Sequence, residues 1–139
     1  MVVMNELAVI PTVGIVVVSN GQILLVAKKN HPQGYYQLPG GQIEPGESHV
    51  QAACRELLET TGLKATSKDM TKIPHVWHAT IEKTYGTKVF ALNCFVCRHY
   101  VGTAIETKDA IPKWFTPAAL ENVQLVPNTL EAIRASRML

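Results

Sequence analysis

Residues 41–63 read GQIEPGESHVQAACRELLETTGL, and they decide the fold because they join a glycine-rich turn to a helix with marked ends. Glycines and a proline in the first six residues predict a loop. Glu47 or Ser48 can cap the free N–H groups of the first helical turn, and Gly62 can take the left-handed conformation that ends a helix. The sequence therefore predicts an amphipathic helix that is bounded at both ends.

Apolar side chains recur along this helix at intervals of three and four residues, which predicts one buried face. Its members are Val50, Ala53, Cys54, Leu57, Leu58 and Thr61. Arg55, Glu56 and Glu59 fall on the opposite side, so two carboxylates one turn apart are expected to share an exposed face. Such a face is usually only solvated, but two oxygen ligands one turn apart can also hold a hard divalent cation. A glycine loop ending at the same place would let a phosphate chain approach the backbone.

The stretch also resembles the signature box of the Nudix hydrolases, which runs from a glycine through a glutamate to Arg-Glu-aliphatic-any-Glu-Glu-any-Gly-aliphatic. This chain supplies eight of the nine specified positions: Gly41, Glu47, Arg55, Glu56, Leu57, Glu59, Gly62 and Leu63. The exception is Thr60, where the family has a second glutamate that usually ligates the catalytic metal. A neutral hydroxyl there removes one negative charge from the expected metal site.

The resemblance implies a Mg²⁺-dependent hydrolase, with Mn²⁺ as a possible substitute, that cleaves nucleoside diphosphates linked to another moiety. On that resemblance Glu56, Glu59 and the Gly40 carbonyl hold the metal. Arg55 orients the carboxylates, and Glu47 supports the junction between loop and helix. Such a metal bridges phosphate oxygens, while a nearby carboxylate orients or deprotonates the attacking water.

The family often adds one catalytic carboxylate from outside the box. The best candidates are Glu106, which we assign as catalytic, and Asp109, because both lie in the polar loop 102–112; the motif does not fix which one acts. Glu82 is a third candidate, but its side chain could simply be solvated opposite a lysine of the same hairpin.

Substrate contacts are expected from Lys28, Gly41 and Asn128. Lys28 and its neighbour Lys29 end a strand upstream of the loop and could meet a phosphate. Asn128 follows Val126-Pro127, a position that resembles MutT-type enzymes in which an asparagine reads a purine edge. Asn128 could also be simply a helix N-cap, and we place the cap first.

Other aromatic and thiol side chains are expected to pack in the core. Tyr35, Tyr36 and Trp77 could stack on a base, but such residues more often pack. Cys94 and Cys97 are three apart in a predicted strand and would point to opposite faces, so they could not converge on one zinc ion. They are expected to be small core side chains.

The order of elements predicts an α/β fold: a Nudix-type α/β/α sandwich with a curved mixed sheet between helices. Strands are expected at 9–18, 22–29, 35–38, 73–83, 87–101 and 113–115, with a hairpin turn at Asn20-Gly21 and a second near Tyr85-Gly86. A short helix at 116–120 and a last helix from about residue 128 follow. The resemblance extends over most of the chain, which predicts one domain over residues 1–139.

Composition is that of one globular domain, with 139 residues, 47% hydrophobic and 17% charged. A net charge of +2 and a pI near 8.5 are too mild to indicate a nucleic-acid surface. The first residues predict neither a signal peptide nor a membrane span, and three cysteines favour a reducing compartment, so the cytoplasm is the expected location. A monomer or homodimer that binds a small nucleotide is expected. The alternative is a Nudix-fold domain that binds a nucleotide or a partner with little turnover, because of Thr60.

Overall fold

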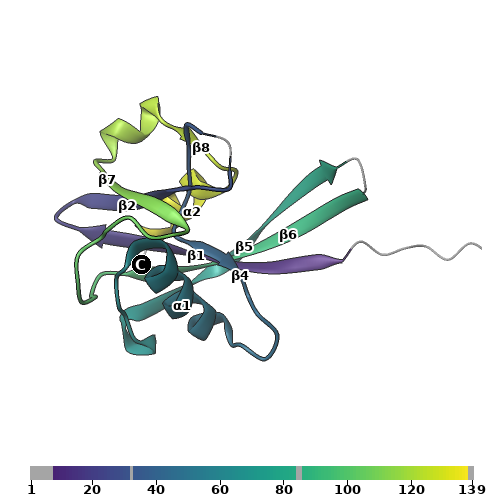
Figure 1. Cartoon of the computed structure of the whole chain (residues 1–139), viewed down its shortest axis with the longest axis horizontal. Coiled ribbons are helices and arrows are strands. Elements are labelled where there is room, and N and C mark those ends of the chain that lie inside the picture. Colours follow the sequence, from purple (N-terminus) through teal and green to yellow (C-terminus); the bar gives the residue numbers. More distant parts are fainter. Residues whose placement is uncertain (1–7, 32, 84–85, 138–139) are drawn as a thin grey trace, which may run out of the picture.

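A computed structural model describes residues 8–31, 33–83 and 86–137. One six-stranded mixed sheet lies between two helices (Figure 1). Its strand order is β5 (Met70–Lys83), β6 (Gly86–Cys97), β1 (Val9–Ser19), β2 (Gln22–Lys28) and β7 (Ala110–Phe115), and β4 (Gly40–Gln42) also pairs with β1. Helix α1 (His49–Thr61) covers one face and α2 (Thr129–Ser136) covers the other. The predicted α/β/α sandwich is confirmed.

Alternating side chains of the strands build a separate core on each face of the sheet. In β1, Val13, Ile15 and Val17 pack under α1, whereas Val16 packs under α2. In β6, Cys94 packs on the α2 side and Cys97 on the α1 side. The prediction that these cysteines face opposite ways is therefore confirmed.

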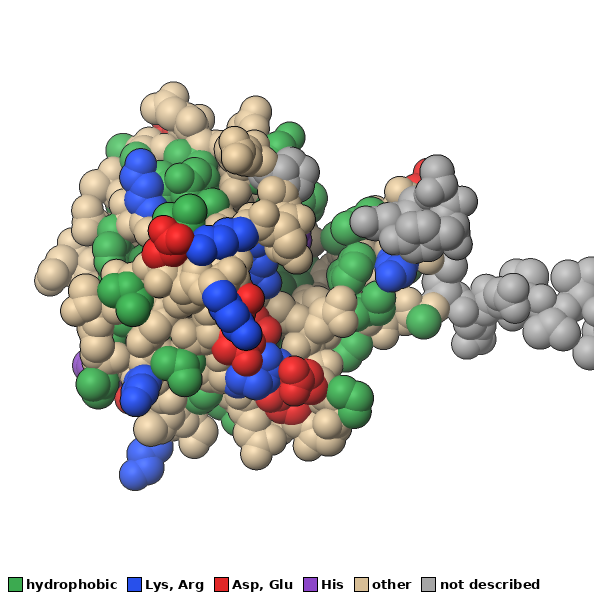
Figure 2. Space-filling view, in the orientation of Figure 1, with side chains coloured by type: hydrophobic (Ala, Val, Ile, Leu, Met, Phe, Trp, Pro, Cys, Tyr) green, Lys and Arg blue, Asp and Glu red, His purple; other side chains and the backbone are tan. Residues whose placement is uncertain are grey.

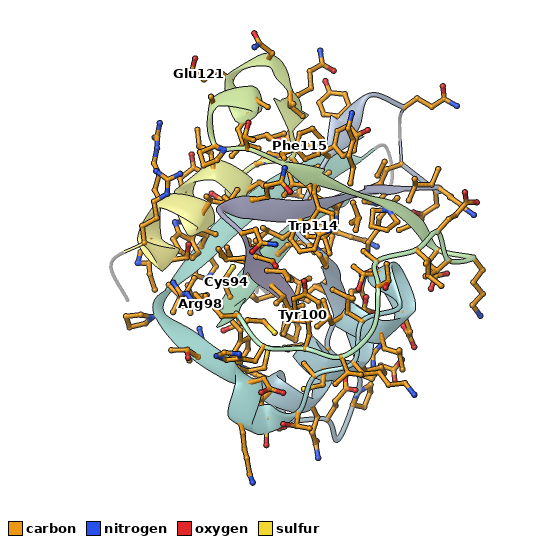
Figure 3. The ribbon with its side chains drawn as sticks, turned by 90° about the vertical axis from the view of Figure 1, so that its left-hand side faces the viewer. Cys94, Arg98, Tyr100, Trp114, Phe115 and Glu121 are labelled. Carbon is orange, nitrogen blue, oxygen red and sulfur yellow. The ribbon has the colours of Figure 1, made fainter. Side chains whose placement is uncertain are left out.

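The last long strand, β7, places one aromatic ring in each core (Figure 3). Trp114 lies on the α1 side, where its ring centroid is 6.4 Å from that of Tyr100. Phe115 lies on the α2 side in an edge-to-face contact with Tyr36, with 5.0 Å between the centroids. Trp77 also packs against the α2-side core, as expected, while Tyr35 is exposed.

Different parts of strand β1 pair with β2 and with β4, and the pairing with β4 positions the glycine loop. Residues 17–19 of β1 pair with β2, and residues 12–14 pair with β4. Gly40 in β4 has a φ of 159°, and a Cβ there would overlap the Val13 carbonyl oxygen. Only glycine fits at that approach. The first residues of the signature box are therefore held against the sheet rather than projecting as a free loop.

Both predicted hairpins form. Asn20 and Gly21 turn between β1 and β2 with φ values of 51° and 73°, as a type I′ turn requires. Strand β5 pairs antiparallel with β6 up to Lys83 opposite Gly86, and the two extend away from the body of the sheet (Figure 1). Tyr85, part of the turn predicted there, lies outside the described residues.

Several boundaries differ from the predictions. Strand β6 ends at Cys97 rather than at 101, and β7 begins at Ala110 rather than at 113 because its first residues pair with the end of β2. The short helix after β7 is a 3₁₀ turn, η2 (Ala118–Asn122). The short elements β3 (Tyr35–Tyr36), η1 (Ser67–Asp69) and β8 (Gln124–Leu125) complete the described chain, with β3 and β8 paired in parallel. Within the described ranges, no helix has the length and apolar character needed to cross a membrane.

Candidate active site

Both ends of α1 are fixed by the residues that the sequence marks. The Ser48 hydroxyl accepts a hydrogen bond from the Gln51 amide at 3.1 Å, and the Gln51 side chain accepts one from the Ser48 amide at 2.8 Å. This capping box satisfies two of the free donors of the first turn. Gly62 ends the helix at φ 80°, in the left-handed conformation. Of the two candidate caps, the structure uses Ser48.

The buried face of α1 differs from the predicted stripe. Three of the six predicted residues are buried, Ala53, Leu57 and Thr61, but Leu58 is 43% exposed. Glu56 and Thr60 are buried instead, with exposures of 8% and 1%. The expectation that Glu56 lies on an exposed face is wrong, because α1 presses this side against β4 and β1 and so turns one carboxylate into the glycine loop.

Arg55 joins the acidic side chains of the box into one network. Its guanidinium donates two hydrogen bonds to the Glu47 carboxylate, at 2.7 and 2.9 Å. One of its nitrogens, Nη1, also donates to Glu56 at 2.9 Å and to Glu59 at 3.1 Å, and Nη2 donates to the Gln42 carbonyl at 3.0 Å. Figure 2 shows acidic and basic side chains gathered over α1 on this face. The bidentate, charge-assisted pair fixes the Glu47 carboxylate, and single charge-assisted bonds tie Glu56 and Glu59 to the same guanidinium.

The pKa values of two acids in this network, Glu47 and Glu56, shift in opposite directions. Hydrogen bonds from Arg55 and from the Glu44 amide lower the pKa of Glu47 from 4.5 to about 2. Burial raises the pKa of Glu56, against the opposing effect of Lys28 and Arg55. Its carboxylate lies over Gly41, where a Cβ would be only 2.5–2.7 Å from the carboxylate atoms. The glycine at position 41 therefore makes room for Glu56.

From the end of β2, the Lys28 side chain reaches the place where Gly40 and Glu56 lie close together, which we call the Gly40–Glu56 corner. Its ammonium donates a hydrogen bond to the Gly40 carbonyl oxygen, which is the expected metal ligand of the loop. It is also close enough to Glu56 to lower the pKa of that carboxyl. The structure thus brings together four of the predicted residues: Gly40, Glu56, Glu59 through Arg55, and Lys28.

A charged cavity of about 280 Å³ opens beside this corner. It is lined by Lys28, Lys29, Asn30, Glu56, Thr60, Lys108 and Asp109. Thr60 faces the cavity, and its hydroxyl donates to the Glu56 carbonyl at 2.7 Å. Asn30 and Lys108 were not identified from the sequence, since isolated polar residues in loops carry no pattern. The one sequence signal that points to Lys108 is its place in the polar loop 102–112 beside Asp109.

The candidate carboxylates outside the box lie in different places. Asp109 lines the charged cavity across from α1. Glu106 is instead ion-paired with Lys29 at 2.7 Å, with an exposed side chain, and is not part of the cavity lining described here. Glu82 is exposed on β5 and lies opposite Thr87. Of these three carboxylates, Asp109 alone lines the cavity, and the Thr107 hydroxyl fixes the loop there by accepting hydrogen bonds from the Asp109 and Ala110 amides.

A longer groove of about 460 Å³ adjoins the cavity. Its apolar wall comes from the sheet and the β5–β6 hairpin, with Leu38, Ala79, Ile81, Phe90 and Leu92. Polar groups include Gln37 and Asn128. Asn128 occupies the position before α2, but its φ is 73° and its side chain makes no capping hydrogen bond. Asn128 is thus the N-cap residue of α2, as preferred, but without the side-chain bond of a cap; its amide nitrogen lies 3.5 Å from the His78 carbonyl oxygen instead.

The donor set of this corner suits a hard divalent cation. Two carboxylates, Glu56 and Glu59, meet the same Arg55 nitrogen, and the Gly40 carbonyl meets the Lys28 ammonium, so all three oxygens already face positive charge. Oxygen ligands of this kind suit Mg²⁺ or Mn²⁺. In the described part of the chain, however, no three His, Cys, Asp or Glu side chains cluster closely enough to hold a metal alone. The carbonyl, water and substrate oxygens would have to complete the shell.

Curated relatives match parts of this chain. A putative 8-oxo-dGTP diphosphatase of Bacillus subtilis (strain 168) is 51% identical over 51 residues, 37% of this chain and 33% of that protein. The oxidized purine nucleoside triphosphate hydrolase of Danio rerio is 32% identical over 102 residues, 73% of this chain and 62% of that protein. An ADP-ribose pyrophosphatase of Methanocaldococcus jannaschii is 43% identical over 49 residues, 34% of this chain and 29% of that protein. The matched segments thus span less than two-thirds of these relatives.

Solved structures share the fold along nearly the whole chain. The solution structure of the Escherichia coli ORF135 protein matches with a TM-score of 0.74 and 26% identity, covering 94% of this chain and 92% of that one. The family model of the NUDIX domain matches residues 9–135. This match includes both cores, the glycine loop, α1 and the groove. The chain therefore belongs to the NUDIX domain family.

Proposed function

We propose that this chain, as one domain over residues 1–139, is a divalent-metal-dependent pyrophosphohydrolase that cleaves a phosphoanhydride bond of a nucleoside triphosphate, with a chemically modified purine nucleotide as the first candidate. One observation carries the proposal. Glu56 lines a charged cavity, Arg55 holds Glu59 to the same nitrogen as Glu56, and Lys28, which is bonded to the Gly40 carbonyl, lines both this cavity and an apolar groove. A nucleotide has a matching division into an anionic chain and a flat, largely apolar base.

The cavity supplies positive charge for the phosphate chain. Lys28, Lys29 and Lys108 line it together with Asn30. Lysine is a suitable point charge for phosphate oxygens, and its flexible stem lets it follow the chain during reaction. Lys29 is held in place by Glu106, which gives that carboxylate a positioning role.

The Gly40 carbonyl, Glu56 and Glu59 would hold the metal, which when bound polarises the phosphate oxygens and stabilises the charge that develops on the leaving group. Arg55 keeps the two carboxylates together through its shared nitrogen. We assign to Asp109, which lines the same cavity as Glu56 and Thr60, the role of accepting the proton of the attacking water.

The groove supports a base as the second part of the substrate. Phe90, Leu92 and Leu38 offer an apolar surface, and Asn128 presents an amide that can both donate and accept. The names of the relatives from Bacillus subtilis and Danio rerio support an oxidised purine, while that of the archaeal relative supports ADP-ribose as the runner-up.

A substrate panel tests the proposal. The purified protein is incubated with Mg²⁺ and dGTP, 8-oxo-dGTP, dCTP or ADP-ribose, and the products are separated by anion exchange. The proposal expects a nucleoside monophosphate and pyrophosphate, with the fastest turnover on the oxidised purine. Preferential hydrolysis of ADP-ribose to AMP and ribose phosphate would transfer the proposal to the runner-up substrate.

A second candidate function follows from Thr60. Without the carboxylate expected there, the domain could bind a nucleotide and release it largely unreacted. Tight binding of the same nucleotides, with turnover near the uncatalysed rate at saturating Mg²⁺ and Mn²⁺, would favour this candidate.

The reducing cytoplasm is the proposed location. All three cysteines, Cys54, Cys94 and Cys97, are free. Burial raises the pKa of Cys94 to about 12 and that of Cys97 to about 11, so both stay as protonated core side chains. Unpaired thiols are typical of reducing compartments, and this supports the location.

A further inference from the structure

The Lys28 ammonium occupies a position that a bound metal would need. It donates to the Gly40 carbonyl, and it acts electrostatically on Glu56. The same side chain lines both the charged cavity and the long groove, a property that in the described chain it shares with Asn30 alone. Lys28 therefore lies where the cavity and the groove join, and its ammonium can contact either the Gly40 carbonyl or a bound ligand.

The charge around this corner explains why a cation rests there. The Arg55 guanidinium already donates hydrogen bonds to Glu47, Glu56 and Glu59. Its Nη1 also lies 3.7 Å from the Glu44 carboxylate oxygen. One guanidinium thus faces several carboxylates, and Glu56 is 8% exposed. A buried carboxylate of this kind is costly without further compensation, and Lys28 provides it.

We propose that Lys28 is a displaceable internal cation: it holds the Gly40–Glu56 corner while no metal is present, and it turns into the charged cavity to meet the phosphate chain when a divalent cation takes its place. The inference rests on the metal site of the proposed function. A second cation at the Gly40 carbonyl would repel the ammonium strongly, since both lie a few ångströms from the same oxygen. The lysine stem is long and flexible enough for its head group to move.

The proposal makes metal and phosphate binding mutually supportive. Metal releases Lys28 for a phosphate oxygen, and a bound phosphate chain keeps Lys28 away from the Gly40 carbonyl. Linkage requires each ligand to raise the affinity for the other by the same factor. Thr60 supports the exchange. It replaces a glutamate of the family pattern, so the Gly40–Glu56 corner carries one negative charge fewer, and Lys28 and Arg55 together can balance the charge that remains.

Titration of Mg²⁺ against the melting temperature tests the exchange. Lys28→Met should lower the Mg²⁺ concentration at half-maximal stabilisation by roughly tenfold, because the competing charge is gone. Lys29→Met is the matched control, since it removes the same charge from the same cavity but from a side chain paired with Glu106. Lys28→Arg keeps the charge and should leave the midpoint within about twofold of the parent.

Chemical labelling gives a second measure on the unchanged protein. Reductive methylation of lysines, followed by mass spectrometry of peptides, should find Lys28 slow without metal and faster with saturating Mg²⁺, because its ammonium has left the Gly40 carbonyl. Adding inorganic pyrophosphate with Mg²⁺ should slow it again. Lys68, which is exposed in η1 and lines neither the cavity nor the groove, serves as the internal reference.

The outcomes separate this inference from the proposed function. A parent protein stabilised by Mg²⁺, with the same midpoint in Lys28→Met, would overturn the exchange and leave the metal site intact. A lower midpoint in Lys28→Met but not in Lys29→Met would support it, even if no tested nucleotide is hydrolysed. If neither parent nor Lys28→Met responds to Mg²⁺ or Mn²⁺, both the metal site and the exchange are wrong.

Discussion

The two helices that cover the sheet begin in opposite ways. At α1, Ser48 and Gln51 close a reciprocal capping box, so the first turn is satisfied by its own side chains. At α2, Asn128 is left-handed and caps nothing with its side chain, which lines the groove instead. The capping side chains at the start of α1 therefore stabilise the helix, whereas the Asn128 side chain at the start of α2 remains available for a ligand in the groove. Under the proposed function, the first helix start would hold the site and the second would help to select its substrate.

The largest effect should come from the carboxylate that α1 buries. Glu56→Gln keeps the size of the side chain but removes its charge, so turnover should fall about a hundredfold or more. The melting temperature without metal should stay within a few degrees of the parent, because the amide oxygen can still accept from Arg55. Steady-state rates and thermal melts of the same preparation check both. Full activity in this variant would show that α1 does not carry the chemistry.

Position 60 gives the next effect. Thr60 lines the charged cavity one turn after Glu56, so Thr60→Glu should lower the Mg²⁺ midpoint of thermal stabilisation by roughly tenfold. The same change should lower the melting temperature without metal, since another buried acid joins the network. Thr60→Gln is the control of similar size without the charge. An unchanged midpoint in Thr60→Glu would mean that this side of α1 does not meet the metal.

Asn128 should affect selection without affecting stability. Asn128→Gly keeps the left-handed backbone, which glycine adopts freely, and removes only the amide. The preference between purine and pyrimidine triphosphates should fall by roughly fivefold to tenfold, the effect of one lost hydrogen bond. Ratios of kcat/KM for paired substrates measure it. An unchanged preference would show that Asn128 does not read the base.

The smallest effect is on the caps themselves. Ser48→Ala should lower the free energy of unfolding by about 1 kcal/mol, the usual cost of losing a cap. Asn128→Gly should change it by less than about 0.5 kcal/mol, since no capping bond is lost and the left-handed conformation is relieved. Urea unfolding of the two variants beside the parent makes the comparison. Equal losses would remove the contrast between the two helix starts.

The sequence predicts best where local chemistry decides the structure. Ser48 and Gly62 mark the ends of α1, and Asn20-Gly21 marks the first hairpin, because a cap or a turn needs only neighbouring residues. The opposite facing of Cys94 and Cys97 follows from the period of a strand alone. These features could be predicted with their residues.

Prediction fails where a long-range contact decides. The rotation of α1 depends on how closely β4 approaches, and this turns Glu56 inward and leaves Leu58 exposed. The choice between Asp109 and Glu106 depends on the path of a loop that pairs with the end of β2. Local sequence propensity predicts neither the rotation of α1 nor the path of this loop.

We expect the site formed by Gly40, Glu56 and Glu59 to hydrolyse a phosphoanhydride bond only when a divalent cation is bound to their oxygens. The direct test is the rate of pyrophosphate release from the best nucleotide of the panel, measured in a chelator and then with increasing Mg²⁺, for the parent and for Glu59→Gln. We expect no release in the chelator, saturable recovery with Mg²⁺, and a midpoint about tenfold or more higher in Glu59→Gln, because one charged ligand is lost. Undiminished release in the chelator, or identical Mg²⁺ curves for the two proteins, would contradict the claim.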